Sequence, residues 1–116
     1  MKIRDKEYGF RLTIGASIQI AKLCPNGDLA RIGEAIGTGY GTQAEVMSKI
    51  VVALNNGYAA AEAFEGRKAE RLTLDDVLAL PPDIFAKMSA EAMHAFMNDV
   101  DGEIEVDQSK KAGAEG

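Results

Sequence analysis

The sequence has no tryptophan, one histidine and one cysteine, and only 6% of its 116 residues are aromatic. A single cysteine, Cys24, cannot form a disulfide within the chain, which fits a reducing compartment. The lone histidine, His94, excludes a metal site built on a pair of histidines, and we expect it on a helix surface. With so few aromatic side chains, a surface that stacks nucleic-acid bases is not expected.

Long apolar runs are also missing. No stretch approaches the roughly 20 apolar residues of a membrane-spanning helix, and the opening "MKIRDKEYGF" lacks the apolar region of a signal peptide. The hydrophobic content of 47% nevertheless suits a globular domain with a modest core. We therefore expect one domain in the cytoplasm, without membrane contact.

The sequence has no basic surplus. The formal net charge is -5, and it is unevenly distributed. Residues 1–98 carry 12 acidic and 11 basic side chains, a net charge of -1, whereas residues 99–116 carry 6 acidic side chains and only Lys110 and Lys111, a net charge of -4. Neither part offers the basic stripe that phosphate contacts require, so nucleic-acid binding is not expected.

Three patterns invite a catalytic interpretation, and each has a simpler structural one. In "GTGYGT", residues 37–42, Thr42 stands where the dinucleotide fingerprint needs its third glycine, so we expect an interhelical loop. Asp75 and Asp76 suit the first turn of a helix, where negative charge is favourable. No nucleophile elbow accompanies His94. We expect no enzymatic activity, no cofactor and no metal.

The first segment, "KIRDKEYGFRLTIGA", predicts a short β-hairpin that leads directly into a helix. Its strands are expected at residues 2–4 and 7–13, with Asp5 and Lys6 in the turn. Alternation of charged and apolar residues points one set inward: Ile3, Tyr8, Phe10 and Leu12. Since an isolated hairpin is marginal in water, this set should lie on a helix.

The remaining chain reads as about four to five helices followed by a tail. Predicted helices span residues 14–23, with an apolar face of Ile14, Ile18, Ile20 and Ala21, and then residues 29–36, 43–65, 74–80 and 82–98. Their N-caps are Thr13, Asp28, Thr42 (a capping box with Glu45) and Thr73, and Pro82 opens the last helix. Gly66 is the expected C-terminal cap of the helix over residues 43–65. The fold class is therefore mainly α, with one domain over residues 1–100 and a disordered acidic tail over residues 101–116.

Two helices have distinctive surfaces. The helix over residues 43–65 carries apolar side chains on several sides, so it should be central; Asn55, Asn56 and Gly57 suggest a kink in it. The last helix has an apolar arc wider than one packing face needs. We predict that part of this arc binds a partner, through Phe85, Met88, Met93, Phe96 and Met97. The alternative is that a small core simply surrounds this helix.

The whole layout resembles the tail assembly chaperones of long-tailed bacteriophages and prophages. The similarity starts with the charged hairpin and its "TIGA" entry to a helix and continues through a mostly helical body. It includes the helix–proline–helix segment "LTLDDVLALPPDIFAKM", residues 72–88, and ends with an acidic, lysine-containing tail. It covers nearly the full length.

This resemblance implies a non-enzymatic role in tail morphogenesis. Members keep the tape measure protein soluble, help to recruit tail tube subunits, and are generally absent from the finished virion. Many are made in two lengths, because a ribosomal frameshift near the end of the first reading frame appends a second domain. Lys110-Lys111 suggests a slippery site, and this chain would then be the short product. We also expect homo-oligomerisation, through the free hairpin edge or the last helix.

Two other classes of protein stay open at this point. An unrelated small helical adaptor of phage or bacterial origin would have the same composition, and a tape measure gene immediately downstream would argue against it. A helical DNA-binding domain is disfavoured by the acidic balance, since the predicted helix over residues 29–36 carries only Arg31 as a cation.

Overall fold

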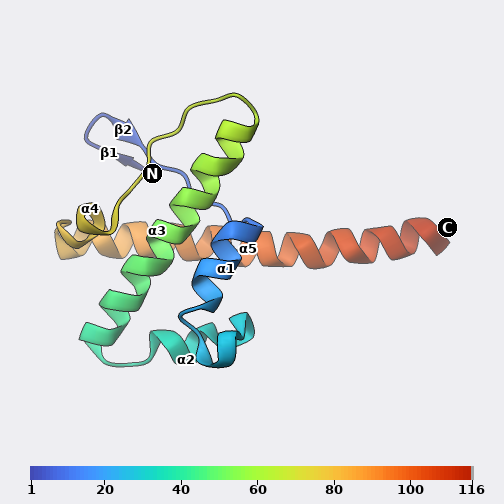
Figure 1. Ribbon diagram of the computed structural model, residues 1–116, viewed down its shortest axis with the longest axis horizontal. Coiled ribbons are helices and arrows are strands. Elements are labelled where there is room, and N and C mark those ends of the chain that lie inside the picture. Colours follow the sequence, from blue (N-terminus) through green and yellow to red (C-terminus); the bar gives the residue numbers. More distant parts are fainter. Residues whose placement is uncertain (116) are drawn as a thin grey trace.

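The computed structural model in Figure 1 describes the backbone of residues 1–115 and the side chains of residues 1–100. A two-stranded hairpin, β1 (Lys2–Ile3) and β2 (Lys6–Glu7), precedes five helices. These are α1 (Ile14–Ala21), α2 (Ile32–Ile36), α3 (Tyr40–Phe64), α4 (Leu74–Leu78) and α5 (Pro82–Glu115), with short 3-10 turns at Pro25–Gly27 and Leu29–Arg31. The predicted mainly helical class with an N-terminal hairpin is confirmed. The backbone of α5 continues as a helix to Glu115, past the predicted end at residue 98, and the side chains of the predicted disordered tail, residues 101–116, lie outside the described part.

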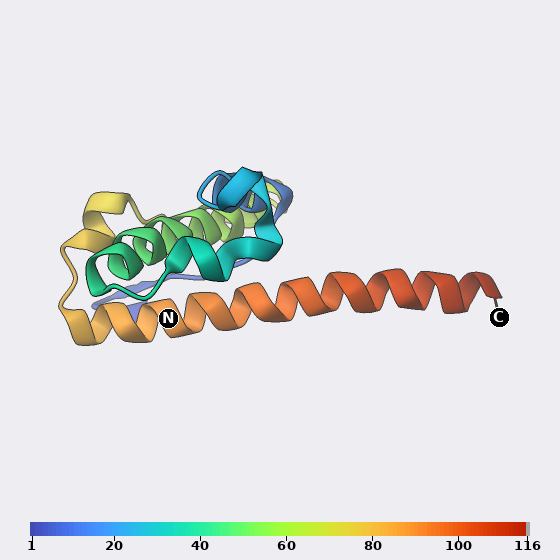
Figure 2. The same ribbon diagram turned by 90° about the horizontal axis from the view of Figure 1, so that it is seen from below.

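Helix α3 is the centre of the fold, as its apolar residues on several sides predicted. It packs against α1 on one side and α5 on the other, and α4 lies near its N-terminal half (Figures 1 and 2). Side chains from all three layers meet in one core, whose largest fully buried members are Ile20, Ile50, Val51, Leu54, Val77 and Met88. Burial of these side chains is the main stabilising contribution to the fold.

The hairpin is shorter than the sequence predicted. Its strands pair antiparallel with Lys2 opposite Glu7 and Ile3 opposite Lys6, so the turn is Arg4-Asp5, one residue earlier than expected. Arg4 adopts a positive φ of 56°, which the tight turn requires. Residues 8–13 form no strand; they run along α3, where the Arg11 N–H donates to the Leu54 carbonyl at 3.0 Å. The predicted inward set does pack against the core: Ile3, Tyr8, Phe10 and Leu12.

Helix α1 begins where predicted but turns a different face inward. The Thr13 hydroxyl caps it by accepting from the Ala16 N–H at 3.2 Å. Ala16 and Ile20 are buried against α3, whereas Ile14 and Ile18 are 72% and 51% exposed, so their predicted place on the core face was wrong. The small side chain of Ala16 lets the two helices approach closely, which rotates the larger residues outward.

Helix α3 begins at Tyr40, inside the segment predicted to be a loop. The predicted capping box at Thr42 is wrong, because Thr42 lies within the helix and the N-cap is Gly39, without a capping side chain. Instead, the Gln43 side-chain amide donates to the Gly37 carbonyl at 2.9 Å and anchors the preceding turn. The predicted kink is also absent from α3, which continues through Asn55 and Gly57. Gly66, with φ of 80°, ends the helix as expected.

Asn55 ties two loops to α3. Its side chain is fully buried, donates to the carbonyls of Gly9 (3.1 Å) and Glu70 (3.2 Å), and accepts from the Leu72 N–H at 2.7 Å. All three partners belong to segments that have no regular secondary structure. The Asn55 side chain therefore supplies the hydrogen bonds that these backbone groups would otherwise form within a sheet or a helix.

The two last helices start at the predicted caps. Thr73 and Asp76 form a capping box at α4: the Asp76 N–H donates to the Thr73 hydroxyl at 3.1 Å and the Thr73 N–H to the Asp76 carboxylate at 2.9 Å. These hydrogen bonds hold the pKa of the Asp76 carboxyl below its usual range. Pro82 occupies the first position of α5, where its missing N–H costs nothing.

The α-amino group of Met1 joins the hairpin to α5. It forms ion pairs with Glu7, on β2, and with Glu91, on α5, at 3.1 Å for the latter. Burial alone would lower the pKa of this amine, but the hydrogen bonds to the two carboxylates outweigh burial and raise it above its ordinary value of 8.0.

The raised pKa of Met1 predicts a loss of stability at alkaline pH. A group that holds its proton more tightly when folded stabilises the fold fully below its unfolded pKa of 8.0, and that contribution disappears as the pH rises through the higher folded value. We expect the melting temperature of Glu91→Gln to fall below that of the wild type near neutral pH, and the difference to shrink toward about pH 10. Glu70→Gln, which removes the surface pair with Lys6, is the control. A constant Glu91→Gln difference across this range would contradict the prediction.

Candidate partner-binding site

The structure separates the five predicted partner-binding residues of α5. Met88 and Phe96 are core side chains, at 0% and 5% exposure. Phe85 and Met93 are half-buried and pack against the same core, while Met97 is 53% exposed. Of the predicted set, only Met97 presents most of its side chain to solvent. The core thus uses most of the wide apolar arc of α5.

Other large apolar side chains are exposed on four different helices. In the described part of the chain these are Ile14, Ile18, Tyr40, Phe64, Leu78 and Met97. Ile14 and Ile18 lie one helical turn apart on α1, opposite the face that Ala16 and Ile20 bury. Single exposed apolar residues are ordinary, but two in register on the outermost helix form a ridge, which we call the α1 ridge.

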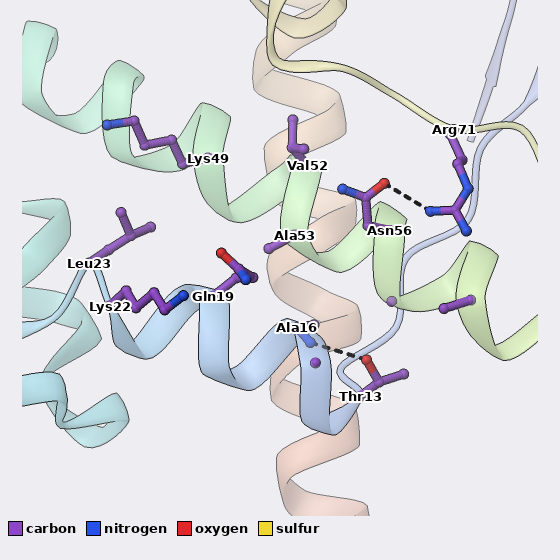
Figure 3. Close-up of a pocket in the computed structure, with 13 residues that line it drawn as sticks. Thr13, Ala16, Gln19, Lys22, Leu23, Lys49, Val52, Ala53, Asn56 and Arg71 are labelled. Carbon is purple, nitrogen blue, oxygen red and sulfur yellow. Dashed lines mark hydrogen bonds between the residues drawn. The ribbon is translucent and has the colours of Figure 1, made fainter.

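A groove runs between α1 and α3, with a volume of about 730 Å³ (Figure 3). Its floor is made of small and apolar side chains, among them Ala16, Val52 and Ala53. At one end α3 lies so close to the start of α1 and the segment before it that a Cβ on Gly57 would be 2.5 Å from the Arg11 carbonyl oxygen and 3.1 Å from the Ala16 Cβ. Lys22 and Lys49 lie at the other end of the groove, away from Thr13 (Figure 3).

The rim of this groove is positively charged. Lys22 on α1, Lys49 on α3 and Arg71 from the connector before α4 all line it, and none of the lining residues in the described part of the chain is acidic. The Arg71 guanidinium donates to the Asn56 amide oxygen at 3.3 Å, which directs it along the rim (Figure 3). Lys49 also pairs with Glu45 at 3.4 Å, one turn back on α3. We call this site the basic groove.

A second depression, beside the hairpin and α4, has no such charge preference. It is lined by the cations Arg4, Lys6 and Arg71 and by the anions Asp5, Asp75 and Asp76. Because the two signs balance, this depression does not select a ligand by charge. The basic groove is the stronger candidate for a polar partner.

Sequence reasoning did not find the basic groove. Lys22, Lys49 and Arg71 come from three separate segments with no shared motif, and only the antiparallel packing of α1 on α3 brings them together. One cation in each of three separate segments does not by itself predict a binding site. The α1 ridge was visible as a pair of isoleucines, but helical periodicity alone assigned it to the core.

The side chains that could bind a metal ion or act in catalysis are dispersed over the described part of the chain. Within the described residues, no cluster of three or more histidine, cysteine, aspartate or glutamate side chains is arranged to hold a metal ion. The Cys24 thiol is buried and donates to the Ile20 carbonyl at 3.4 Å; burial raises its pKa, which lowers its reactivity. His94 lies on the exposed surface of α5, as predicted, within 3.3 Å of the Asn98 side chain.

Comparisons with protein-family models, with curated proteins and with solved structures found no match to this chain. Among the helices described, none combines the length and the apolar character that crossing a bilayer would require.

Proposed function

We propose that this chain is a tail assembly chaperone of a long-tailed bacteriophage or prophage. It would act without enzymatic activity in the cytoplasm of the bacterial host, where it binds the tape measure protein and helps to recruit tail tube subunits. The observation that carries the proposal is the full-length resemblance in layout: a charged hairpin that leads into a helix, a helical body, the segment over residues 72–88, and an acidic end.

Surface chemistry supports this proposal. A chaperone of a long amphipathic helix needs apolar side chains on a well-packed body that stays folded while they are exposed. The α1 ridge meets this need, since Ile14 and Ile18 contribute nothing visible to the core and α1 is anchored by Ala16 and Ile20 beneath them. Met97, which is 53% exposed on α5, offers a second, flexible contact.

This proposal predicts that the α1 ridge keeps the client soluble. The tape measure protein from the same locus should be largely soluble when co-expressed with this chain and largely insoluble without it. The double variant Ile14→Ser and Ile18→Ser should lose at least half of that soluble fraction, because it removes the apolar contacts and leaves the core intact. The measurement is the soluble share of the tape measure protein after centrifugation, with circular dichroism to confirm that the variant is folded.

The control is Leu78→Ser, which alters a side chain of similar exposure on α4. It should leave the soluble fraction unchanged. If the wild-type chain has no effect on the tape measure protein, the proposed function is wrong. If Leu78→Ser acts like the ridge variant, the client surface lies elsewhere.

The same locus tests the predicted frameshift. Expression with the downstream DNA should give a second, longer product that shares this N-terminus and diverges near Lys110-Lys111, which peptides spanning residues 106–111 would show in mass spectrometry. A single product would remove the frameshift from the proposal and leave the chaperone role to the solubility experiment.

A further inference from the structure

The basic groove has the dimensions of a binding site for an extended acidic element. Lys49 and Asn56 stand seven residues apart on α3, which places the two ends of the groove about 10 Å apart at 1.5 Å per residue. Lys22 and Lys49 are at one end, and Arg71, held by Asn56, is at the other (Figure 3). A single small anion cannot contact both ends at once. The partner that fits is a chain segment with acidic side chains along it and apolar ones for the floor.

This protein carries such a segment itself. "DGEIEVD", residues 101–107, contains four acidic and two apolar residues and no basic one. It begins just after Asp99 and Val100, which belong to the body: Asp99 accepts from the Leu12 N–H at 2.8 Å and Val100 packs against the core. The cations of the groove and the anions of this segment are therefore complementary in sign, and both sites combine charge with apolar surface. A charge match of this kind favours rapid and specific association of the two sites.

The geometry places the segment out of reach of its own groove. Helix α5 packs on the side of α3 that faces away from α1, and it continues to Glu115 past the end of the body (Figure 2). In Figure 3 the groove opens in front of α3, and α5 lies behind it. A continuous α5 thus carries residues 101–107 away from the groove of the same molecule.

We infer that the basic groove of one molecule binds the acidic segment, residues 101–107, of a second copy. The two sites are different surfaces, so the contact is heterologous, and each added copy leaves one groove and one acidic segment open. The association is therefore head-to-tail and grows with concentration. This inference holds whether or not the proposed chaperone function is correct.

Complementary variants of the full chain test it. The groove variant combines Lys22→Glu with Lys49→Gln, where glutamine avoids a like-charge pair with Glu45. The tail variant combines Asp101→Lys, Glu103→Lys and Glu105→Lys. Sedimentation should show that the mass of the wild type rises over a roughly hundredfold concentration range. Each variant alone should be monomeric, with its association weakened at least about tenfold.

Mixing the two variants gives the decisive result. The groove variant still supplies an acidic segment and the tail variant still supplies a groove, so an equimolar mixture should form a one-to-one complex that does not grow further. The complex should dissociate in high salt, since exposed charges are screened. A matched control, Lys87→Glu with Lys68→Gln, makes the same charge change on side chains that do not line the groove, and it should associate like the wild type.

Three results would overturn the inference. The first is a wild-type chain that stays monomeric over the whole range, and the second is a groove variant that associates as the wild type does. The third is a mixture of the variants that stays monomeric. Both Lys22 and Lys49 are exposed, so circular dichroism should show unchanged folding in the groove variant, and failure of the client experiment would leave these results unaffected.

Discussion

Asn55→Ala should lower the free energy of unfolding by about 3 to 5 kcal/mol, the largest effect that we expect from a single substitution. The change removes three hydrogen bonds and leaves the Leu72 N–H and the carbonyls of Gly9 and Glu70 without their partner. Each buried polar group left unpaired costs about 1–3 kcal/mol. Urea denaturation followed by circular dichroism would measure the loss.

The adjacent asparagine provides a control of the same residue type. Asn56 is only half-buried and makes one long contact, with Arg71 at 3.3 Å, so Asn56→Ala should change the free energy of unfolding by less than about 1 kcal/mol. Equal effects of the two substitutions would show that helix propensity, rather than the loop anchorage by Asn55, determines the stability of this region.

Gly57→Ala should be the second most damaging change, although alanine is the better helix former. Propensity alone would stabilise α3 by up to about 1 kcal/mol. However, the added methyl group would sit 2.5 Å from the Arg11 carbonyl oxygen and 2.9 Å from the Thr13 hydroxyl. The first is a backbone atom of the segment that leads into α1, and the methyl group would also lie 3.1 Å from the Ala16 Cβ, so this segment and the start of α1 must move away from α3. We expect a net loss of about 2 kcal/mol, which is roughly 10 °C in melting temperature for a domain of this size.

Gly41→Ala is the matched control for Gly57→Ala. It lies in the same helix, and a methyl group there would meet no atom within 4 Å. This substitution should leave the melting temperature unchanged or raise it slightly. If Gly57→Ala were also neutral, the close approach of α1 and α3 would have to be wrong.

Local signals in the sequence predicted the positions of most elements. Thr13, Asp28, Thr73, Pro82 and Gly66 mark helix ends through their own side chains or backbone freedom, and all five do so in the structure. These residues act through neighbours within a few positions, so the sequence alone is enough to interpret them.

Features that depend on distant segments were predicted poorly. The capping box at Thr42 was a sound local pattern, but α3 begins earlier and Gln43 binds the turn at Gly37 instead. Asn55 and Gly57 resembled a weak point of a helix, and they are the residues where two loops and α1 are fixed. Their roles come from Gly9, Arg11 and Leu72, which lie 15 or more positions away.

Packing also reversed the apparent importance of residues in α1. By hydrophobicity alone, Ile14 and Ile18 rank above Ala16 as core residues, yet the close crossing at Gly57 has room only for the alanine. The candidate binding surfaces follow from this same crossing: it exposes the two isoleucines and opens the basic groove beside them. For that reason the sequence could suggest a partner-binding role without locating the surface.

The position of α5 at the end of the chain has a consequence for synthesis on the ribosome. Leu54 is translated well before Phe96, and the core between them closes only when α5 has emerged. At roughly 5–20 residues per second, those 42 residues take about 2–8 seconds. During that interval the side of α3 that α5 will cover is exposed to solvent in every nascent chain, and a chaperone that recognises apolar nascent segments would be expected to bind this face before the body is complete.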